Sequence, residues 1–508
     1  MARKTSRRRT RDQTLGINQQ RFQQLENPFE PFKIFSADQI EAIHHASLRL
    51  LQESGIEFQL DEAIEVLGNA GADVAAGSQR VRMSPEFVME KIATAPSEFK
   101  LHARNPRHTL KFGGKSIAYA SIASAPNVSD AVRGRRSGNF EDYCDLLRLT
   151  QSLNVAHFVG GYAVEPMDLP VNTRHLHALQ AAAKLTDKSF LGYAIGGARM
   201  EDAIEIARIA RGIDHNTLRQ EPSIHTVINS NSPLVYDGAL LEGAIAMAKA
   251  GQVAIYTPFT LAGAMAPVTL AGALVQQNAE ALAGIAFSQC VSPGTPVMYG
   301  SFTSNVDMKS GSPAFGTPEY AKATIASGQL ARKYSIPIRA SNVTSSNAAD
   351  AQAAYESQMS LWACMLGQIH CVNHGLGWQE GGLCTSFEKF ILDAEMIQMM
   401  QAFLLKPATE ESDLAVDAIA EVGPASHFFA SPHTMERYET AFYAPLLSDW
   451  RNFENWQDGG SMDATQRATS IWQELLRNYE EPFMAPEISE ELDAFVAHRV
   501  EEGGVPAI

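Results

Sequence analysis

Aromatic rings, side-chain amides and one histidine follow the ends of eight short apolar runs in this sequence. They are Tyr119, Tyr162, Tyr193, Asn229, Asn231, Tyr256, Phe259, Tyr299, Phe302, Asn342, Asn373 and His374. These positions include no cluster of lysines for a Schiff base, no group of carboxylates for magnesium and no Gly-x-Ser-x-Gly motif. The faces of aromatic rings attract cations. The pattern therefore favours a bound cation or methylated amine over a phosphorylated sugar.

His374 is the strongest single candidate for a functional side chain. Two glycines follow it closely, and the sequence EGGL stands at residues 380–383. Glycine allows the backbone to approach a ligand closely, and His374 and Glu380 together can orient a substrate or accept a proton. A structural histidine in a hydrogen-bonded loop is the alternative. We predict no metal site, because His370 and Cys371 face opposite sides of a strand and cannot both join His374 around a zinc ion.

The elements that must position these side chains alternate regularly. Strand-like runs occupy residues 116–121, 156–162, 189–195, 223–229, 253–259, 296–302, 336–342 and 369–375, and their starts lie 30 to 43 residues apart. Helix-start signals such as Thr317-Pro318-Glu319 lie between them. This arrangement predicts an α/β protein with a TIM (β/α)8 barrel, whose chemistry lies at the carboxyl ends of the strands. The doubly wound alternative usually has a glycine-rich first turn, which residues 119–126 do not supply.

We expect four segments. Residues 1–35 form a basic and disordered tail, 36–112 an N-terminal helical segment, 113–405 the barrel, and 406–508 a C-terminal helical extension. Ser36 with Gln39 is a capping box that begins the helical segment. The extension is rich in aromatic residues, and we expect them to pack across the barrel as a cap, with a docking surface as the alternative. They are Phe428, Phe429, Tyr438, Phe442, Tyr443, Trp450, Phe453 and Trp456.

Charge and composition exclude several classes of protein. The net charge is −16 although the first eleven residues carry six positive side chains, so the rest of the chain is strongly acidic and would repel nucleic acid. The N-terminus lacks the apolar region of a secretion signal. The uncharged run 250–279 is interrupted by Pro258 and Pro267, so we expect no membrane span. Five cysteines without a C-x-x-C pair indicate a reducing compartment, by default the cytoplasm.

Five motifs in a fixed order resemble those of the trimethylamine methyltransferase family. They are PFTLAGAMAPVTLAGAL at 258–274, GTPEY at 316–320, EGGL at 380–383, EKFILDAE at 388–395 and SPHT at 431–434. Each motif is weak alone, but together they are specific, and the resemblance extends over about residues 36–464.

The resemblance implies a TIM barrel that moves a methyl group from an amine to the Co(I) form of a corrinoid. A separate small protein carries that corrinoid, and the Asp-x-His-x-x-Gly pattern of many corrinoid carriers does not occur in this chain. The founding members of the family contain pyrrolysine and use trimethylamine, whereas this chain contains only standard residues. It therefore resembles the branch without pyrrolysine, which includes glycine betaine methyltransferases.

On this basis the sequence predicts a small methylated amine as substrate and assigns residues to its two ends. The trimethylammonium group is expected among Tyr119, Tyr162, Phe259 and Tyr299. A carboxylate or other polar tail is expected near Asn229, Asn231, His374 and Gln379. His374 and Glu380 are the predicted catalytic residues, and the residues that would contact the corrinoid are not identified.

Three other functions remain open at this stage. One is methyl transfer from trimethylamine or another methylated amine, and another is a non-catalytic barrel that only binds a quaternary amine. The third is an unrelated barrel enzyme such as an aldolase, which would need a catalytic lysine that the strands and their ends do not contain. A homo-oligomer is compatible with the sequence.

Overall fold

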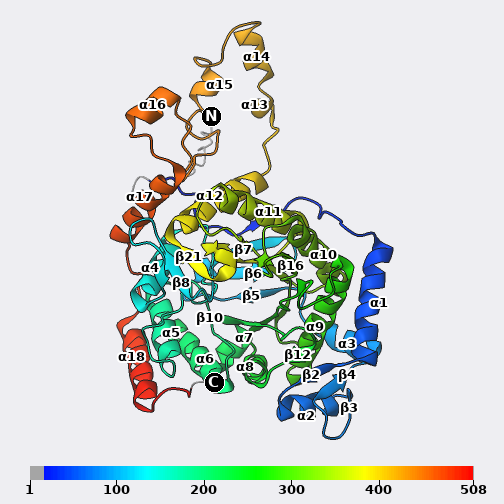
Figure 1. Cartoon of the computed structure of the whole chain (residues 1–508). Coiled ribbons are helices and arrows are strands. Elements are labelled where there is room, and N and C mark those ends of the chain that lie inside the picture. The colour runs from blue at the N-terminus through cyan, green and yellow to red at the C-terminus, as the bar shows by residue number, and fades with distance from the viewer. Residues whose placement is uncertain (1–16, 507–508) are drawn as a thin grey trace, which may run out of the picture.

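The computed structural model describes residues 17–506, and its body is built on one eight-stranded sheet (Figure 1). The strand order is β1-β7-β19-β18-β15-β13-β11-β10. All the strands from β7 to β10 in this order are parallel, and β1 pairs antiparallel with β7. Their bounds are β1 Leu25–Glu26, β7 Ser116–Ser121, β10 Phe190–Leu191, β11 Ile224–Ile228, β13 Val253–Tyr256, β15 Val297–Gly300, β18 Ile338–Ser341 and β19 Cys371–Leu376.

Helices connect the parallel strands and cover one face of the sheet (Figure 1). Asn139, Asp237, Thr269, Thr317, Asp350 and Ser386 cap six of them at their N-termini through side-chain hydrogen bonds. The helices are α4 Phe140–Ser152, α5 Arg174–Leu185, α6 Gly197–Arg211, α7 His215–Gln220, α8 Gly238–Lys249, α9 Leu270–Val291, α10 Pro318–Tyr334, α11 Ala351–Gly367 and α12 Phe387–Leu404. The predicted α/β alternation is confirmed.

The closed eight-stranded barrel is not confirmed, because the predicted strand 156–162 is irregular. Phe158 forms a single bridge with Ala120, the His157 N–H donates to the Tyr119 carbonyl at 2.8 Å, and the Val159 N–H donates to the Ser189 carbonyl at 2.9 Å. Gly161 then adopts φ +149°. Glycine in a strand interior weakens it, and the ladder between β7 and β10 is therefore interrupted.

Side-chain alternation decides which residues face inward. Ala118, Val253, Ile255, Met298 and Cys371 form an inner core that the hairpin of β5 (Phe99–Leu101) and β6 (Leu110–Phe112) completes. The neighbouring strand residues instead join the large core beneath the helices.

Two small sheets extend the loops that follow the strands. One joins β14 (Leu261–Ala262), β16 (Ser304–Val306) and β17 (Pro313–Ala314), and the other joins β20 (Trp378–Gln379), β21 (Cys384–Ser386), β8 (Asn127–Ser129) and β9 (Arg136–Ser137). These sheets fix the loops at the carboxyl ends of the strands, where a site is expected.

The N-terminal region differs from the prediction in two ways. Residues 1–16 lie outside the described residues, but residues 17–35 are packed on the body, where β1 pairs with β7 and Gln19 and Asn27 are buried. The expected disorder is therefore wrong for 17–35. The helical segment contains α1 Ala37–Glu53, α2 Asp61–Asn69 and α3 Pro85–Ile92, but also β2 Ile56–Phe58, β3 Asp73–Val74 and β4 Arg80–Arg82, which form a sheet with β12 Val235–Tyr236. The Ser36 capping box is confirmed.

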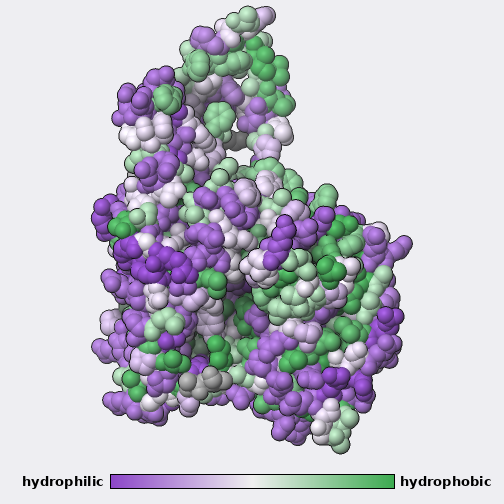
Figure 2. Space-filling view, viewed as in Figure 1, coloured by the Kyte–Doolittle hydropathy of each residue, from purple (hydrophilic) through white to green (hydrophobic). Residues whose placement is uncertain are grey.

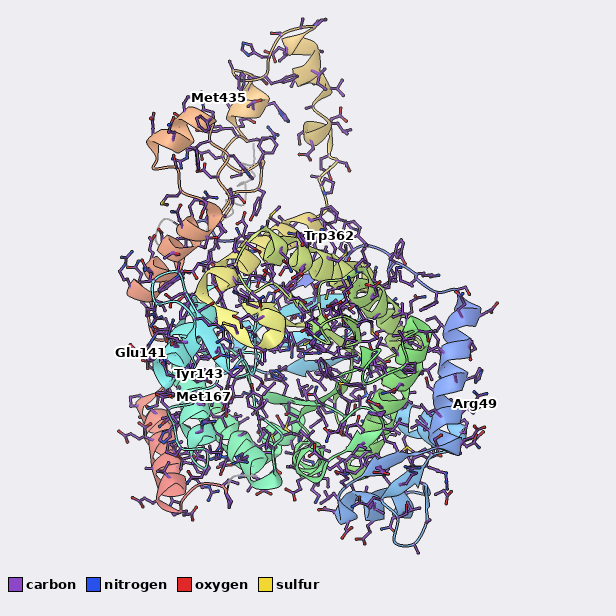
Figure 3. All side chains as sticks on the ribbon, viewed as in Figure 1. Arg49, Glu141, Tyr143, Met167, Trp362 and Met435 are labelled. Atoms are coloured by element: carbon purple, nitrogen blue, oxygen red, sulfur yellow. The ribbon has the colours of Figure 1, made fainter. Side chains whose placement is uncertain are left out.

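The C-terminal extension has two parts. Helices α17 (Ala464–Arg477) and α18 (Pro486–Glu501) pack on the body, against α12 and against α5 and α6 respectively. The segment that holds α13 (Glu411–Leu414), α14 (Val416–Val422), α15 (Pro432–Met435) and α16 (Phe453–Asp458) projects from the body (Figure 1). Figure 3 places Met435 in this projecting segment and Trp362 on the body below it.

The aromatic cap predicted for this extension is wrong. Phe429 is 83% exposed and Phe442 is 82% exposed, and Figure 2 shows further hydrophobic surface over α13 and α14. The aromatic content of this extension favoured buried side chains. Several of these side chains are exposed because the chain runs away from the body here. Among residues 17–506, no helix combines the length and apolar character that crossing a membrane requires.

Candidate active site

Four aromatic rings meet beyond the carboxyl ends of β13, β15 and β19. Phe259, Phe302, Phe315 and Trp378 come from four loops or rim strands, and all but Phe259 are at most 7% exposed. The ring centroid of Phe302 lies 5.2 Å from that of Phe259, 5.6 Å from that of Phe315 and 6.0 Å from that of Trp378. We call these four residues the aromatic cluster. Its ring faces and edges offer the environment that a quaternary ammonium prefers.

His374, which the sequence predicts as a site residue, lies against this cluster. Its ring centroid is 4.5 Å from that of Trp378 and 6.2 Å from that of Phe302. The backbone of His374 adopts φ +54°, at a point where the pairing of β19 with β7 changes register. A left-handed conformation in a non-glycine residue is strained and is concentrated at functional sites.

The hydrogen bonds of His374 determine the form of its ring. The Ala123 N–H donates to Nδ1 at 3.1 Å. Burial, and next the nearby Arg339, hold the pKa of His374 well below its usual range, so the ring is neutral at pH 7. Because Nδ1 accepts a hydrogen bond, we assign the single proton to Nε2.

Arg339 adjoins the aromatic cluster and His374, and it was not predicted from the sequence. It extends from the middle of β18, its Cζ lies 5.2 Å from the Phe302 ring centroid, and its Nη2 lies 3.0 Å from Nε2 of His374. It is 2% exposed. The signal that could have identified it is a charged residue inside the apolar run 336–342, since arginine is almost never fully buried unless it is paired.

Gln379 and Glu380 follow Trp378 and differ in how they are bound. Gln379 is buried, its Nε2 donates to the Asn347 carbonyl at 2.7 Å, and its Oε1 has no partner among the described residues. The Glu380 carboxylate accepts from Nε of Arg135 at 3.0 Å through both of its oxygens. Glu380 is thus adjacent to the site in sequence, with its side chain committed to an ion pair.

Tyr162 belongs to a separate group of tyrosines. Its ring centroid is 4.4 Å from that of Tyr193 and 5.7 Å from that of Tyr143, which is labelled in Figure 3. The Tyr193 hydroxyl accepts from the Tyr162 N–H and from Ser124 Oγ. Burial raises the pKa of Tyr162 well above its usual value, which keeps the phenol neutral. Within residues 17–506, no ring contact joins Tyr162 directly to the aromatic cluster.

Besides Tyr162, four predicted substrate residues are not brought to the aromatic cluster. Tyr119 and Tyr299 lie on the helix-covered side of their strands, because alternation gives the inner face to Ala118 and Met298. Tyr119 stacks on His157, and the Tyr299 hydroxyl bonds to Gln277 and Asn278 of α9. Asn229 and Asn231 are exposed in the loop after β11. For the two tyrosines the placement was wrong by one residue of strand alternation.

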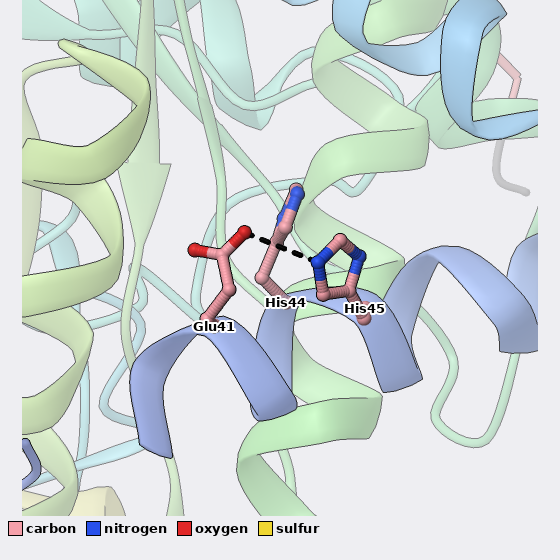
Figure 4. A group of neighbouring side chains, drawn as sticks. All are labelled: Glu41, His44 and His45. Carbon is pink, nitrogen blue, oxygen red and sulfur yellow. Dashed lines mark ion pairs between the residues drawn. The ribbon is translucent and has the colours of Figure 1, made fainter. Parts of the chain in front are cut away.

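A second cluster of ionisable groups lies on α1 (Figure 4). Nitrogen or oxygen atoms of Glu41, His44 and His45 all lie within 4.8 Å of one another. Glu41 pairs with His45 at 3.2 Å and with Lys333 at 2.6 Å, while Nδ1 of His44 bonds to the Tyr334 hydroxyl at 2.9 Å. These partners join α1 to α10, so we interpret the cluster as structural.

Two buried histidines should make the stability of the fold sensitive to acid. Burial lowers the pKa of His157 to about 4 and that of His225 to about 3. The unfolded chain binds protons at these residues below about pH 6.5, whereas the folded chain does not until the pH is far lower. The free energy of unfolding should therefore fall by up to about 2 kcal/mol per histidine between pH 7 and pH 5.

Urea unfolding at the two pH values checks this prediction. His225 packs edge-on to Phe158 at 5.1 Å, and neither ring nitrogen has a partner among the described residues. His225→Phe should reduce the loss of stability between pH 7 and pH 5, whereas His215→Phe on the surface should not. An equal loss in wild type and His225→Phe would show that His225 does not carry the effect.

Comparison with known proteins shows to which family this chain belongs. The model of the Trimethylamine methyltransferase (MTTB) family matches residues 2–504. A glycine betaine methyltransferase of Desulfitobacterium hafniense (strain Y51) is 39% identical over 474 residues, which are 93% of this chain and 98% of the relative. A trimethylamine methyltransferase MttB of Desulfitobacterium hafniense (strain DSM 10664 / DCB-2) is 28% identical over 93% of this chain and 95% of the relative.

Among solved structures, the crystal structure of the hydroxylamine MtmB complex has a similar fold. The TM-score is 0.50 at 11% identity, and the match covers 89% of this chain and 90% of that one. At this identity the likeness concerns the fold alone. The match of the family model over nearly the whole chain decides the family, and this protein belongs to the trimethylamine methyltransferase (MTTB) family of enzymes.

Proposed function

We propose that this enzyme transfers a methyl group from a quaternary amine, glycine betaine or a close analogue, to a Co(I) corrinoid carried on a separate protein. The observation that carries the proposal is the aromatic cluster with His374 at the carboxyl ends of the strands. The 39% identity to a glycine betaine methyltransferase supports the same substrate class.

The chemistry matches these residues. When a nucleophile takes one methyl group from a quaternary ammonium, the leaving group is a neutral tertiary amine. It therefore needs no acid catalyst. The corrinoid supplies the cobalt nucleophile when its carrier is bound. The remaining work is to hold the cation, aim one methyl group and exclude water, and proximity alone can supply roughly 7–11 kcal/mol. Each ring face contributes about 0.5–2 kcal/mol to holding the cation.

Exposed apolar residues on several loops support docking of the carrier at the same end of the sheet. Each belongs to a different loop that follows a strand or the segment 156–162, and each is at least 45% exposed. They are Val132, Met167, Ile195, Val268, Met308 and Leu383. Single exposed apolar side chains are common on protein surfaces, so the support comes from their shared position on loops at this end of the sheet.

We also propose the finer architecture and the compartment. Residues 156–162 would complete a TIM-type barrel within 113–405, supported by the Ala120–Phe158 bridge and the hydrogen bonds on both sides of it. Residues 36–112 and 406–508 would be the N-terminal and C-terminal additions. All five cysteines are free thiols, which supports a reducing compartment such as the cytoplasm.

Methyl transfer to free Co(I)-cobalamin tests the proposed reaction. Purified enzyme is incubated with a panel of methylated amines, and methylcobalamin is measured by its visible spectrum. Glycine betaine or another quaternary amine is expected to be active. Activity with trimethylamine alone would contradict the substrate class. Tight binding of betaine with no methyl transfer to cobalamin or to a corrinoid protein would instead identify a non-catalytic binding protein.

The role of His374 can be measured in the same assay. His374→Ala should lower kcat/KM for methyl transfer at least tenfold, about 1.4 kcal/mol, because the ring contacts the aromatic cluster directly. His215→Ala is the matched control, since His215 is exposed on α7. Undiminished turnover with an unchanged KM in His374→Ala would remove His374 from the site.

A further inference from the structure

Arg339 is a buried cation whose hydrogen-bonding capacity is largely unused. Its Nε and Nη1 have no partner among the described residues, although the side chain is 2% exposed. Buried donors are almost always satisfied in native proteins, and an orphaned one requires an explanation. An acceptor that is absent from the protein chain itself is the simplest explanation.

The two lysines that are buried to the same degree show how this chain normally treats a buried cation. The Nζ of Lys188 donates to four backbone carbonyls, among them those of Thr150 and Ala156 at 2.6 Å. The Nζ of Lys389 pairs with Asp393 and donates to Ser357. Arg339 has neither provision. Burial lowers its pKa, and the neighbours that oppose this effect are Cys371, Tyr320 and Cys364, with no carboxylate among them.

His374 adds a second unused donor beside Arg339. Because the Ala123 N–H occupies Nδ1 of the neutral ring, Nε2 carries the proton, yet Nε2 lies 3.0 Å from Nη2 of Arg339. Two N–H donors therefore point towards each other. An oxygen anion that accepts from both would remove this conflict, and a planar guanidinium is well suited to a carboxylate.

This pair of donors adjoins the aromatic cluster. The Phe302 ring contacts the guanidinium, with Cζ 5.2 Å from its centroid, and is also packed against Phe259 and Trp378. A ligand that carries a cation and an anion separated by a short linker could thus occupy both parts at once. A cation without the anion would meet the uncompensated positive charge of Arg339 and be repelled.

We propose that Arg339 and His374 Nε2 form a carboxylate-binding subsite, and that the substrates are therefore zwitterionic trimethylammonium carboxylates and not simple cationic or neutral amines. This inference rests on the proposed function for the ammonium end of the substrate. Of the residues predicted for the polar tail it keeps His374, and it replaces the exposed Asn229 and Asn231 with Arg339 of β18.

Equilibrium binding to the full-length protein by titration calorimetry tests the subsite without methyl transfer. The probes are glycine betaine, choline and glycine betaine methyl ester, which keeps the ammonium group but neutralises the carboxylate. Wild type should bind betaine about 100-fold more tightly than either analogue. Both analogues lack the charged carboxylate that would pair with the buried guanidinium, and losing such a partner is costly. Equal affinity for betaine and its methyl ester in wild type would overturn the proposal, whether or not any variant folds.

Variants at position 339 provide the second test. Arg339→Met should lose most of the preference for betaine over choline, and Arg339→Lys should restore part of it. Arg219→Met, an exposed arginine on α7, is the control and should keep the full preference. If Arg339→Met weakened betaine and choline equally, Arg339 would be a structural residue and the subsite would be rejected.

The assays separate this inference from the proposed reaction. If no amine methylates a corrinoid but betaine binding still depends on Arg339, the subsite stands and the proposed reaction fails. If Arg339→Met demethylates betaine with unchanged kcat/KM, the reaction stands and the subsite fails.

Discussion

Asp393→Ala should destabilise the fold by about 3–5 kcal/mol, the usual cost of removing one partner from a buried ion pair. Asp393 and Lys389 both lie on α12 with completely buried side chains. The Asp393 carboxylate also accepts from Asn342 Nδ2 at 3.1 Å, Ser357 Oγ at 3.1 Å and the Gly377 N–H at 2.8 Å. The substitution would leave Lys389 charged and nearly unpaired in the core.

Urea unfolding of three variants checks this expectation. Asp393→Ala should show a much lower midpoint than wild type, while the double variant Lys389→Met/Asp393→Leu should recover most of the loss because it removes both charges. Asp493→Ala is the matched control, since the Lys184–Asp493 pair is at the surface and should contribute little. If the double variant were less stable than Asp393→Ala, the unpaired lysine would not be the cause of the loss.

The consequences should extend to the active site. Asp393 links the end of β18, through Asn342, to Gly377, which precedes Trp378. Loss of the carboxylate should therefore loosen the loop that carries part of the aromatic cluster. In this way the ion pair would support the candidate site from outside the aromatic cluster.

Trp378→Ala should lower kcat/KM for methyl transfer by about 100-fold, the largest effect on activity expected for a single ring of the aromatic cluster. The Trp378 ring contacts those of His374, Phe302 and Phe315, with centroid distances of 4.5, 6.0 and 5.8 Å. Its Nε1–H donates to the Thr344 carbonyl at 3.0 Å, which fixes the ring orientation. Truncation removes both a ring face for the proposed cation and packing against the His374 ring.

Steady-state methyl transfer with Co(I)-cobalamin measures this effect. Trp378→Phe should retain intermediate activity because a ring face remains. Trp362→Ala should leave kcat/KM unchanged, since Trp362, labelled in Figure 3, is 36% exposed on α11 and its ring packs against Phe403. Wild-type kcat/KM in a folded Trp378→Ala enzyme would exclude the aromatic cluster as the site that holds the substrate.

Local features of this protein follow from the sequence alone. Ser36, Asn139 and Thr317 cap helices because their side chains satisfy backbone N–H groups only three residues away. Apolar periodicity located the parallel strands but not the irregularity at 156–162, and the glycines after His374 marked the loop that carries Trp378. The family could also be recognised from the sequence, because the order of its motifs along the chain does not depend on how the chain folds.

Long-range features were decided by the tertiary structure. Whether Tyr119 and Tyr299 face the site depends on a shift of one residue in a strand, which periodicity does not resolve. The pairing of Arg339 with His374 joins β18 to β19, and a buried charge can be interpreted only when the absence of a partner among the described residues is known. The exposure of the projecting aromatic segment and the irregularity of residues 156–162 also depend on such long-range contacts. Burial and strand pairing are properties of contacts between distant residues, and composition reports only which residues are available for them.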